Sequence, residues 1–342
     1  MTNPTQAPTE ADTLGTADTI RPTDDASAPV FRGLSPGQLM WRRFMRDRTG
    51  VVSAVVVLFF VLIAIAAPLI SVIYGKDPTT TYGQNSPELL TDSGLPVGPN
   101  GGMDGDFWFG LEPGLGRDVF MLLIYGIRTS LLIAVVTSLA TTVLGVAIGV
   151  AAGYLGGKTD YFVGRVIDIL MSFPSQIFLI ATMPVVSSLL VANNEKQPTW
   201  LSFTAVTIVL SLLGWMGLAR ILRATTLSLR EREFIEAAKV TGASPARIIF
   251  KELLPNLWTP ILVQSTLALP AFVTAEAGLS YLGVGVTEPT PDWGRMIADA
   301  ATYLRTDVTF LLFPGLAMVL FVLAFNLLGD SVRDAFDPKT KR

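Results

Sequence analysis

The sequence predicts an all-α polytopic membrane protein with six transmembrane helices. Of its 342 residues, 50% are hydrophobic and only 15% are charged, whereas soluble domains carry about 25% charged residues. Six stretches contain no Asp, Glu, Lys or Arg and are long enough to cross a bilayer, which takes roughly 20 mostly apolar residues. Buried helices of a soluble core are the alternative, but they are usually shorter and carry a polar stripe.

The chain contains no cysteine and no histidine. Thiol nucleophiles, disulfides, zinc clusters, haem ligation by histidine and Ser-His or Cys-His catalytic pairs are therefore excluded. The formal net charge of -3 gives no indication of nucleic-acid binding, and we expect no nucleic-acid partner.

The residues before the first span divide into a tail and a short helix. Residues 1–33 are rich in Thr, Pro, Ala and Asp, which is typical of a disordered cytoplasmic tail. They lack the basic and apolar regions of a signal peptide. Ser35 and Pro36 suit the N-cap and first position of a helix. The arginines and apolar residues around Trp41 predict an amphipathic interfacial helix over residues 34–50.

We expect the six spans to be helices, because hydrocarbon offers the backbone no other hydrogen-bond partners. They run over Val51–Gly75, Thr129–Gly157, Ile169–Asn194, Gln197–Ala219, Leu253–Ala275 and Val308–Gly329. Five prolines within or near the spans are expected to kink or end helices locally: Pro68, Pro174, Pro184, Pro270 and Pro314. In the second span, Gly145, Gly149 and Gly153 recur every four residues, a pattern that lets helices approach closely.

The distribution of Lys and Arg predicts that both termini are cytoplasmic. Basic residues precede the first span, fill the connection between the fourth and fifth spans, and follow the sixth. Between Tyr74 and Asp118, seven acidic residues outnumber two basic ones, which indicates an outer segment. Its Gly, Pro, Asn and Asp content predicts irregular structure. The chain then divides into the first transmembrane helix (51–75), an extracytoplasmic loop (76–127) and a transmembrane core (128–342).

The sequence of the largest inner loop, residues 224–256, predicts a helix, a break and a second helix. Residues 233–241 are good helix formers, and Gly242 can adopt the left-handed conformation that ends a helix. Ser244 and Pro245 suit the start of the next helix. A rigid two-helix loop between two spans can transmit force, whereas a solvated charged connector is the alternative interpretation.

Residues of this loop resemble a known motif. Glu236-Ala237-Ala238, Gly242 and Leu254-Pro255 are similar to the EAA motif of permease subunits in binding-protein-dependent ABC importers, with Glu252 at a position that is hydrophobic in the motif. Further segments resemble the C-type permease of the dipeptide/oligopeptide/nickel branch: Gly116–Phe120, Ile124–Leu131, Ala275–Gly285, Pro289–Gly294 and Asn326–Pro338.

The resemblance implies a type I ABC importer permease fold in the cell membrane of a prokaryote. It implies a second homologous permease, one or two cytoplasmic ATPase subunits that bind ATP and Mg, and an extracytoplasmic binding protein that delivers di- or oligopeptides. This chain, surrounded by lipids, would itself carry no cofactor and perform no catalysis. Nickel or another small non-peptide cargo is the alternative. An ion-coupled secondary transporter is less favoured, because Glu276 is the one acidic residue well inside a span and no internal repeat is evident.

In the family the loop helix is a coupling helix that docks on the ATPase. The resemblance therefore implies an ATPase-coupling site made of Glu236, Ala237, Ala238, Gly242, Ser244 and Pro245. The carboxylate would meet a basic group, and the two alanines would keep the docking face slim. The segment Gly153–Thr159 is not a P-loop, because Ala152 stands where a P-loop has glycine.

Polar residues at membrane depth are further candidates for function. Four candidates for the pathway or its gate are Asp168, Gln176, Gln264 and Glu276. The alternatives are an ion pair for the aspartate, a structural role for the glutamate and bonds across helices for the glutamines. Three residues of the last outer loop are candidates for contact with the binding protein or for packing against the second permease: Asp292, Trp293 and Arg295.

Overall fold

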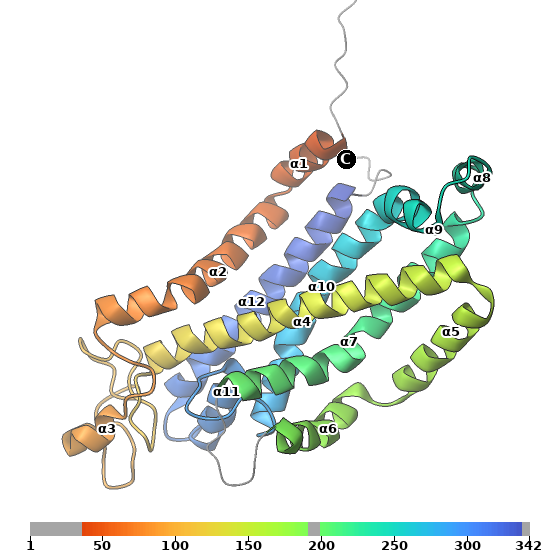
Figure 1. The fold of residues 1–342 in the computed structure, drawn as a ribbon. Helices are drawn as coiled ribbons and strands as arrows, with labels where there is room; N and C mark the ends of the chain where they lie inside the picture. Colours follow the sequence, from red (N-terminus) through yellow and green to blue (C-terminus); the bar gives the residue numbers. More distant parts are fainter. Residues whose placement is uncertain (1–35, 191–198, 337–342) are drawn as a thin grey trace, which may run out of the picture.

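The computed structural model describes residues 36–190 and 199–336, and it is helical throughout that part of the chain apart from its loops (Figure 1). The predicted tail over 1–33 lies outside the described residues. The elements are α1 (Pro36–Arg46), α2 (Arg48–Tyr74), α3 (Tyr82–Asn85), a 3₁₀ turn (Pro87–Leu89), α4 (Val119–Leu155), α5 (Gly157–Ser172), α6 (Ser175–Leu190), α7 (Thr199–Leu229), α8 (Glu233–Val240), α9 (Pro245–Arg247), a π-helical turn (Ile248–Leu253), α10 (Leu254–Tyr281), α11 (Trp293–Thr302) and α12 (Val308–Phe336).

Five continuous helices are long and apolar enough to cross a membrane: α2, α4, α7, α10 with the turns before it, and α12. The bent pair α5–α6 follows α4 (Figure 1) and, counted as one broken span, brings the number of candidate crossings to six. The all-α, six-span prediction is therefore confirmed, with one broken span.

The third span, predicted over Ile169–Asn194, begins earlier, at Gly157, and is broken at Pro174, where the sequence predicts a kink or a helix end. Residues 191–194 lie outside the described residues. α5 and α6 meet at an angle of 90°, and Phe173 between them has an extended backbone with ψ at 138°. The cause is Pro174, because a proline lacks the N–H that would continue a helix and disfavours the helical conformation in the residue before it. The other prolines named above lie inside helices that continue past them.

Four other spans extend six or more residues beyond their predicted limits, and α10 and α12 do so at their C-terminal ends, Tyr281 and Phe336. α4 begins at Val119, so residues 119–127 belong to this helix and not to the outer loop, and α7 continues to Leu229. A span counted only to its first charged residue stops short at Arg128 or Arg220. Long arginine side chains are tolerated near helix ends, since their head groups reach water or an acidic partner.

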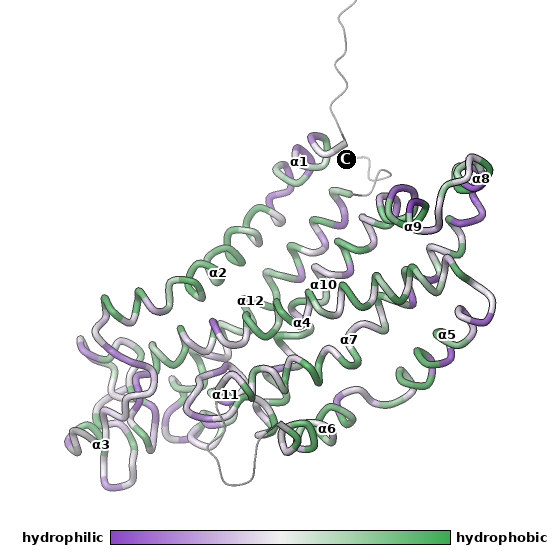
Figure 2. The backbone as a smooth tube through the Cα atoms, viewed as in Figure 1, coloured by the Kyte–Doolittle hydropathy of each residue, from purple (hydrophilic) through white to green (hydrophobic). Residues whose placement is uncertain are grey.

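The helix ends separate into two groups. α1, the end of α12, α8 and α9 lie at one end of the bundle, whereas α3, α6 and α11 lie at the other (Figure 1). The long helices are hydrophobic along their middle sections, and hydrophilic residues gather at the two ends (Figure 2). This arrangement is the one expected of a chain that crosses a bilayer an even number of times. We call the end with α8 the inner end and the end with α3 and α11 the outer end.

α4 and α7 pack closely through the glycines of α4. A Cβ atom on Gly149 would lie 2.6 Å from the carbonyl oxygen of Ala219, and one on Gly153 would lie 2.7 Å from that of Arg223. Both distances are shorter than van der Waals contact, so only glycine allows the two backbones to lie at this separation. The close approach predicted from the four-residue glycine repeat is confirmed.

The outer segment before α4 is fixed by a buried ion pair. Arg117 Nε and Nη2 donate to the two carboxylate oxygens of Glu112 at 2.5 and 2.7 Å, and both residues are buried. Burial raises the pKa of Glu112, and the guanidinium beside it opposes that rise. Asp118 then caps α4 by accepting a hydrogen bond from the backbone N–H of Met121 at 2.8 Å.

Gly149→Val tests the contact between α4 and α7. The added side chain must push Ala219 away, so we expect the free energy of unfolding to fall by about 1–3 kcal/mol, seen as a lower melting temperature of the purified chain. Gly315→Val in α12 is the matched control, because a Cβ there meets nothing within 4 Å. Equal melting temperatures for the two variants would contradict the tight contact.

Candidate functional site

The inner loop has the helix, break and helix that its sequence predicts. Gly242 adopts a left-handed conformation with φ at 80°, and the backbone N–H of Ala243 donates to the carbonyl of Ala238 at 3.0 Å. Ser244 caps the next helix by accepting from the N–H of Arg247 at 3.3 Å, and Pro245 takes its first position. The chain then reverses between α8 and α9 with its helix ends satisfied.

Apolar contacts anchor α8 to the membrane helices. Ile235 of α8 is fully buried, and Ile248 after α9 is nearly so. Both belong to a cluster with Val150 of α4, Leu222 of α7 and Leu257 of α10. Because three spans hold the loop at once, a force applied to α8 reaches all three. The interpretation of the loop as a loose charged connector is not supported by this packing.

The opposite face of α8 is open. The side chains of Glu236 and Ala237 are exposed and that of Ala238 is half-buried, while Val240 is 88% exposed. A cleft of about 450 Å³ adjoins this face, lined by Tyr154, Leu155, Arg230, Glu231, Glu236 and Lys239. The helix thus presents a carboxylate, small side chains and an apolar tip to a partner.

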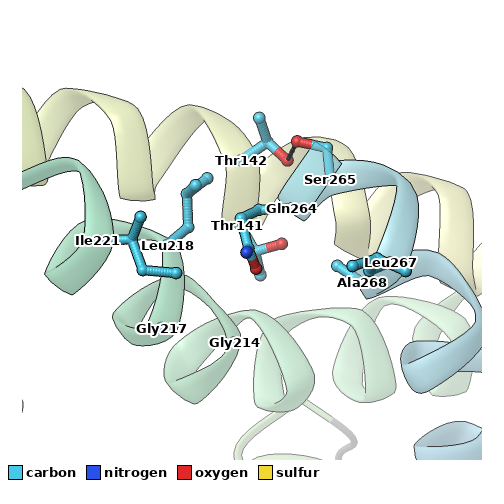
Figure 3. Close-up of a pocket in the computed structure, with 10 residues that line it drawn as sticks. All are labelled: Thr141, Thr142, Gly214, Gly217, Leu218, Ile221, Gln264, Ser265, Leu267 and Ala268. Atoms are coloured by element: carbon cyan, nitrogen blue, oxygen red, sulfur yellow. Dashed lines mark hydrogen bonds between the residues drawn. The ribbon is translucent and has the colours of Figure 1, made fainter. Parts of the chain in front are cut away.

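A second cavity lies between α4, α7 and α10, near the middle of all three helices (Figure 3). Its volume is about 230 Å³, and its lining is Thr141, Thr142, Gly214, Gly217, Leu218, Ile221, Gln264, Ser265, Leu267 and Ala268. The hydroxyls of Thr142 and Ser265 are 2.9 Å apart and connect α4 to α10. None of these lining residues carries a charge.

The four pathway candidates from the sequence do not come together. Only Gln264 lines the cavity, and Gln176 is exposed on α6. Asp168 Oδ1 accepts a hydrogen bond from Arg220 Nη2 of α7 at 2.6 Å. The aspartate therefore forms an ion pair, which was the alternative to a role in the pathway. Glu276 is fully buried near the outer end of α10. The other polar residues of the cavity were missed, although Thr141-Thr142 and the serine after Gln264 interrupt apolar runs.

A second ion pair ties α5 to α7 beside the first. Arg223 Nη2 donates to Asp160 Oδ2 at 2.8 Å, and the guanidinium Nε contacts the other carboxylate oxygen. Together with the pair formed by Asp168 and Arg220, it fixes the inner half of the broken span against α7.

Asp292 and Trp293 are core residues of this chain. Both are fully buried, and the indole packs against Phe60 and Phe321 with ring centroids 6.0 and 5.7 Å apart. Direct contact of these two side chains with an external protein is therefore wrong, whereas Arg295 is half-buried. The sequence contains a signal for a short amphipathic helix that packs against the core: an aspartate suited to an N-cap precedes apolar residues at helical spacing.

Glu276 and Asp292 approach one hydroxyl group inside the protein. Ser280 Oγ donates to Glu276 Oε1 at 3.1 Å and also bonds to the carboxyl of Asp292. Asp292 Oδ1 accepts from the backbone N–H of Arg295 at 3.0 Å and caps α11. Burial raises the pKa of Asp292 to about 6. The second oxygen of each carboxyl has no hydrogen-bond partner within the described residues. This arrangement joins α10 to the outer connection and gives it a structural role.

Family comparisons place the chain among membrane transport components. Residues 145–342 match the family described as binding-protein-dependent transport system inner membrane component. Residues 35–91 match the N-terminal transmembrane domain of oligopeptide transport permease C.

Curated relatives cover almost the whole chain. It is 32% identical over 323 residues to a dipeptide transport system permease protein of Alkalihalophilus pseudofirmus, covering 94% of this chain and 96% of that protein. It is 35% identical over 323 residues to the corresponding Bacillus subtilis protein, with 94% and 91% covered. An oligopeptide transport system permease protein of Haemophilus influenzae is 33% identical over 309 residues, with 89% and 90% covered.

One solved structure supports the fold. The chain resembles a chain of the inward-facing MetNI methionine ABC transporter with a TM-score of 0.51 and 21% sequence identity. The match covers 63% of this chain and 96% of that one. At this identity the likeness extends to the fold alone, and it agrees with the type I permease fold predicted from the sequence.

Substitutions of Asp292 separate its charge from its capping role. Asn keeps an acceptor for the Arg295 N–H and carries no charge that burial would penalise, so we expect Asp292→Asn to retain close to the original melting temperature. Asp292→Ala loses the cap and is expected to lower the free energy of unfolding by about 1 kcal/mol. Thermal unfolding of the purified variants measures both, and an alanine variant as stable as the asparagine variant would contradict the capping role.

Proposed function

The chain belongs to the family of binding-protein-dependent transport system inner membrane components, and on this premise we propose that it forms, with a second homologous permease, the translocation path for di- or oligopeptides across a prokaryotic cell membrane. The curated relatives are named for dipeptide and oligopeptide transport, which favours peptides over nickel or another small cargo. Family membership also disfavours an ion-coupled secondary transporter.

The inner loop is the proposed contact with the ATPase. An exposed Glu236 and Ala237 on a helix anchored by the buried Ile235 suit a docking surface that must move together with the membrane helices. ATP and Mg would bind to one or two separate cytoplasmic ATPase subunits, and this chain would not hydrolyse ATP. Gly242, Ser244 and Pro245 would set the turn that positions α8 for docking.

The neutral cavity between α4, α7 and α10 is the proposed part of the path. At about 230 Å³ it is smaller than the roughly 300–1,000 Å³ of a typical ligand site, so the second permease would complete it. An extracytoplasmic binding protein would deliver the peptide at the end that carries α3 and α11. Both termini would then be cytoplasmic, which agrees with the basic residues of α1 and the inner loop.

Reconstitution tests the proposal directly. The chain, its second permease, the ATPase subunits and the binding protein are placed in proteoliposomes, and uptake of a labelled dipeptide is measured with and without ATP. We expect uptake that requires both ATP and the binding protein. Uptake driven by an ion gradient without ATP would contradict the importer function.

Glu236→Lys tests the coupling contact. Reversing the charge at a docking surface costs several kcal/mol, so we expect peptide uptake to fall by about tenfold or more while the variant remains in the membrane at the normal level. ATP hydrolysis by the assembly should no longer respond to the loaded binding protein. Asp330→Lys is the control, because Asp330 is an exposed acidic residue of α12 outside the loop. Normal uptake by Glu236→Lys would contradict the coupling role.

A further inference from the structure

The lining of the cavity between α4, α7 and α10 is unusual for the middle of a membrane span. It combines hydroxyls, an amide and two glycines in helices that are otherwise apolar. Groups that can form hydrogen bonds are expensive in hydrocarbon unless they find partners. The hydrogen bonds that these groups already make show which of them are left for a ligand.

The hydroxyl hydrogens of the cavity are already used. Thr141 Oγ1 donates to the carbonyl of Thr137 at 2.9 Å, and Ser265 Oγ donates to that of Ile261 at 2.7 Å. With the serine hydrogen engaged, the short contact of 2.9 Å between Thr142 and Ser265 is donated by the threonine. Each hydroxyl oxygen has two acceptor sites, so acceptor capacity remains at the cavity wall.

Gln264 supplies the free hydrogen-bond donors that the hydroxyls lack. Its side chain is half-buried, it lines the cavity together with Thr141 (Figure 3), and no hydrogen bond of its amide is found within the described residues. A side-chain amide offers two donors and an acceptor. The cavity therefore contains free donors and acceptors beside one another and no charge.

A peptide main chain has the complementary pattern, because each residue presents one N–H donor and one C=O acceptor. Gly217 leaves space for it, since a Cβ there would meet nothing within 4 Å. A charged lining would favour cargo of the opposite sign and disfavour cargo of the same sign. A neutral lining with donors and acceptors can instead bind the main-chain N–H and C=O groups that all peptides share.

We propose that this cavity is a binding site for the main-chain amide groups of the transported peptide, with Gln264 as its central contact, and that its neutrality allows the path to accept side chains of either charge. The proposal rests on the proposed function and deepens it by assigning a place and a mode of recognition within the span.

Gln264→Glu in the complete reconstituted transporter tests the site. Uptake of alanyl-lysine, alanyl-glutamate and dialanine is measured at about pH 8, where a carboxyl without strong perturbation is ionised, and at peptide concentrations that saturate the binding protein. We expect the ratio of alanyl-lysine to alanyl-glutamate uptake to rise by about tenfold over the original ratio. Gln38→Glu, the same substitution on an exposed position of α1 away from the cavity, should leave the ratio unchanged.

Gln264→Leu provides a second measurement that does not depend on placing a charge in the span. Loss of the amide should lower the uptake of all three peptides by a similar factor, about fivefold to tenfold, while the loaded binding protein still stimulates ATP hydrolysis. Original uptake rates in Gln264→Leu would overturn the site and leave the importer function standing. Failure of the unmodified assembly to take up any peptide would instead overturn the proposed function.

Discussion

Hydrocarbon provides no hydrogen-bond partners, and the structure follows from that constraint. It makes each crossing helical, and it requires a partner for each polar group that lies at membrane depth. The ion pairs of Asp160 and Asp168 with the arginines of α7 meet that requirement within the chain. The amide of Gln264 does not, so its place is in a wetted or occupied cavity. The same constraint thus explains both the fold and the position of the candidate path.

The proposed docking role of α8 depends on a different feature, the burial of one isoleucine. Ile235 lies among side chains of α4, α7 and α10, so α8 forms part of the bundle despite its exposed outer face. A docking helix needs both properties: an exposed face that a partner can bind and a buried face that fixes the helix to the membrane helices. The left-handed Gly242 and the capping Ser244 keep the turn compact, so little movement is lost in the loop.

Much of this arrangement is readable from the sequence because it depends on local rules. Charge-free runs give the number of crossings, and Gly242 with Ser244-Pro245 gives the break in the inner loop. Pro174 predicts a break in the third span, because a proline kinks or ends a helix. The angle of the bend is not predictable from the proline alone, because it depends on how α6 packs. The burial of Trp293 was missed because the segment was assigned to an outer loop, although Asp292 suits an N-cap and precedes apolar residues at helical spacing. The cavity combines residues more than 120 positions apart, and no local pattern joins Thr142 to Ser265.

The two arms of the broken span share one apolar attachment to α7. Leu179 and Met183 of α6 and Ile167 of α5 belong to the same apolar cluster as Val206 and Leu210 of α7. α5 adds two charge pairs with arginines of α7 to this attachment. The arm that carries the charge pairs is thus held to α7 by more than its apolar contacts, and the joint at Phe173 is where the two arms can change their angle independently.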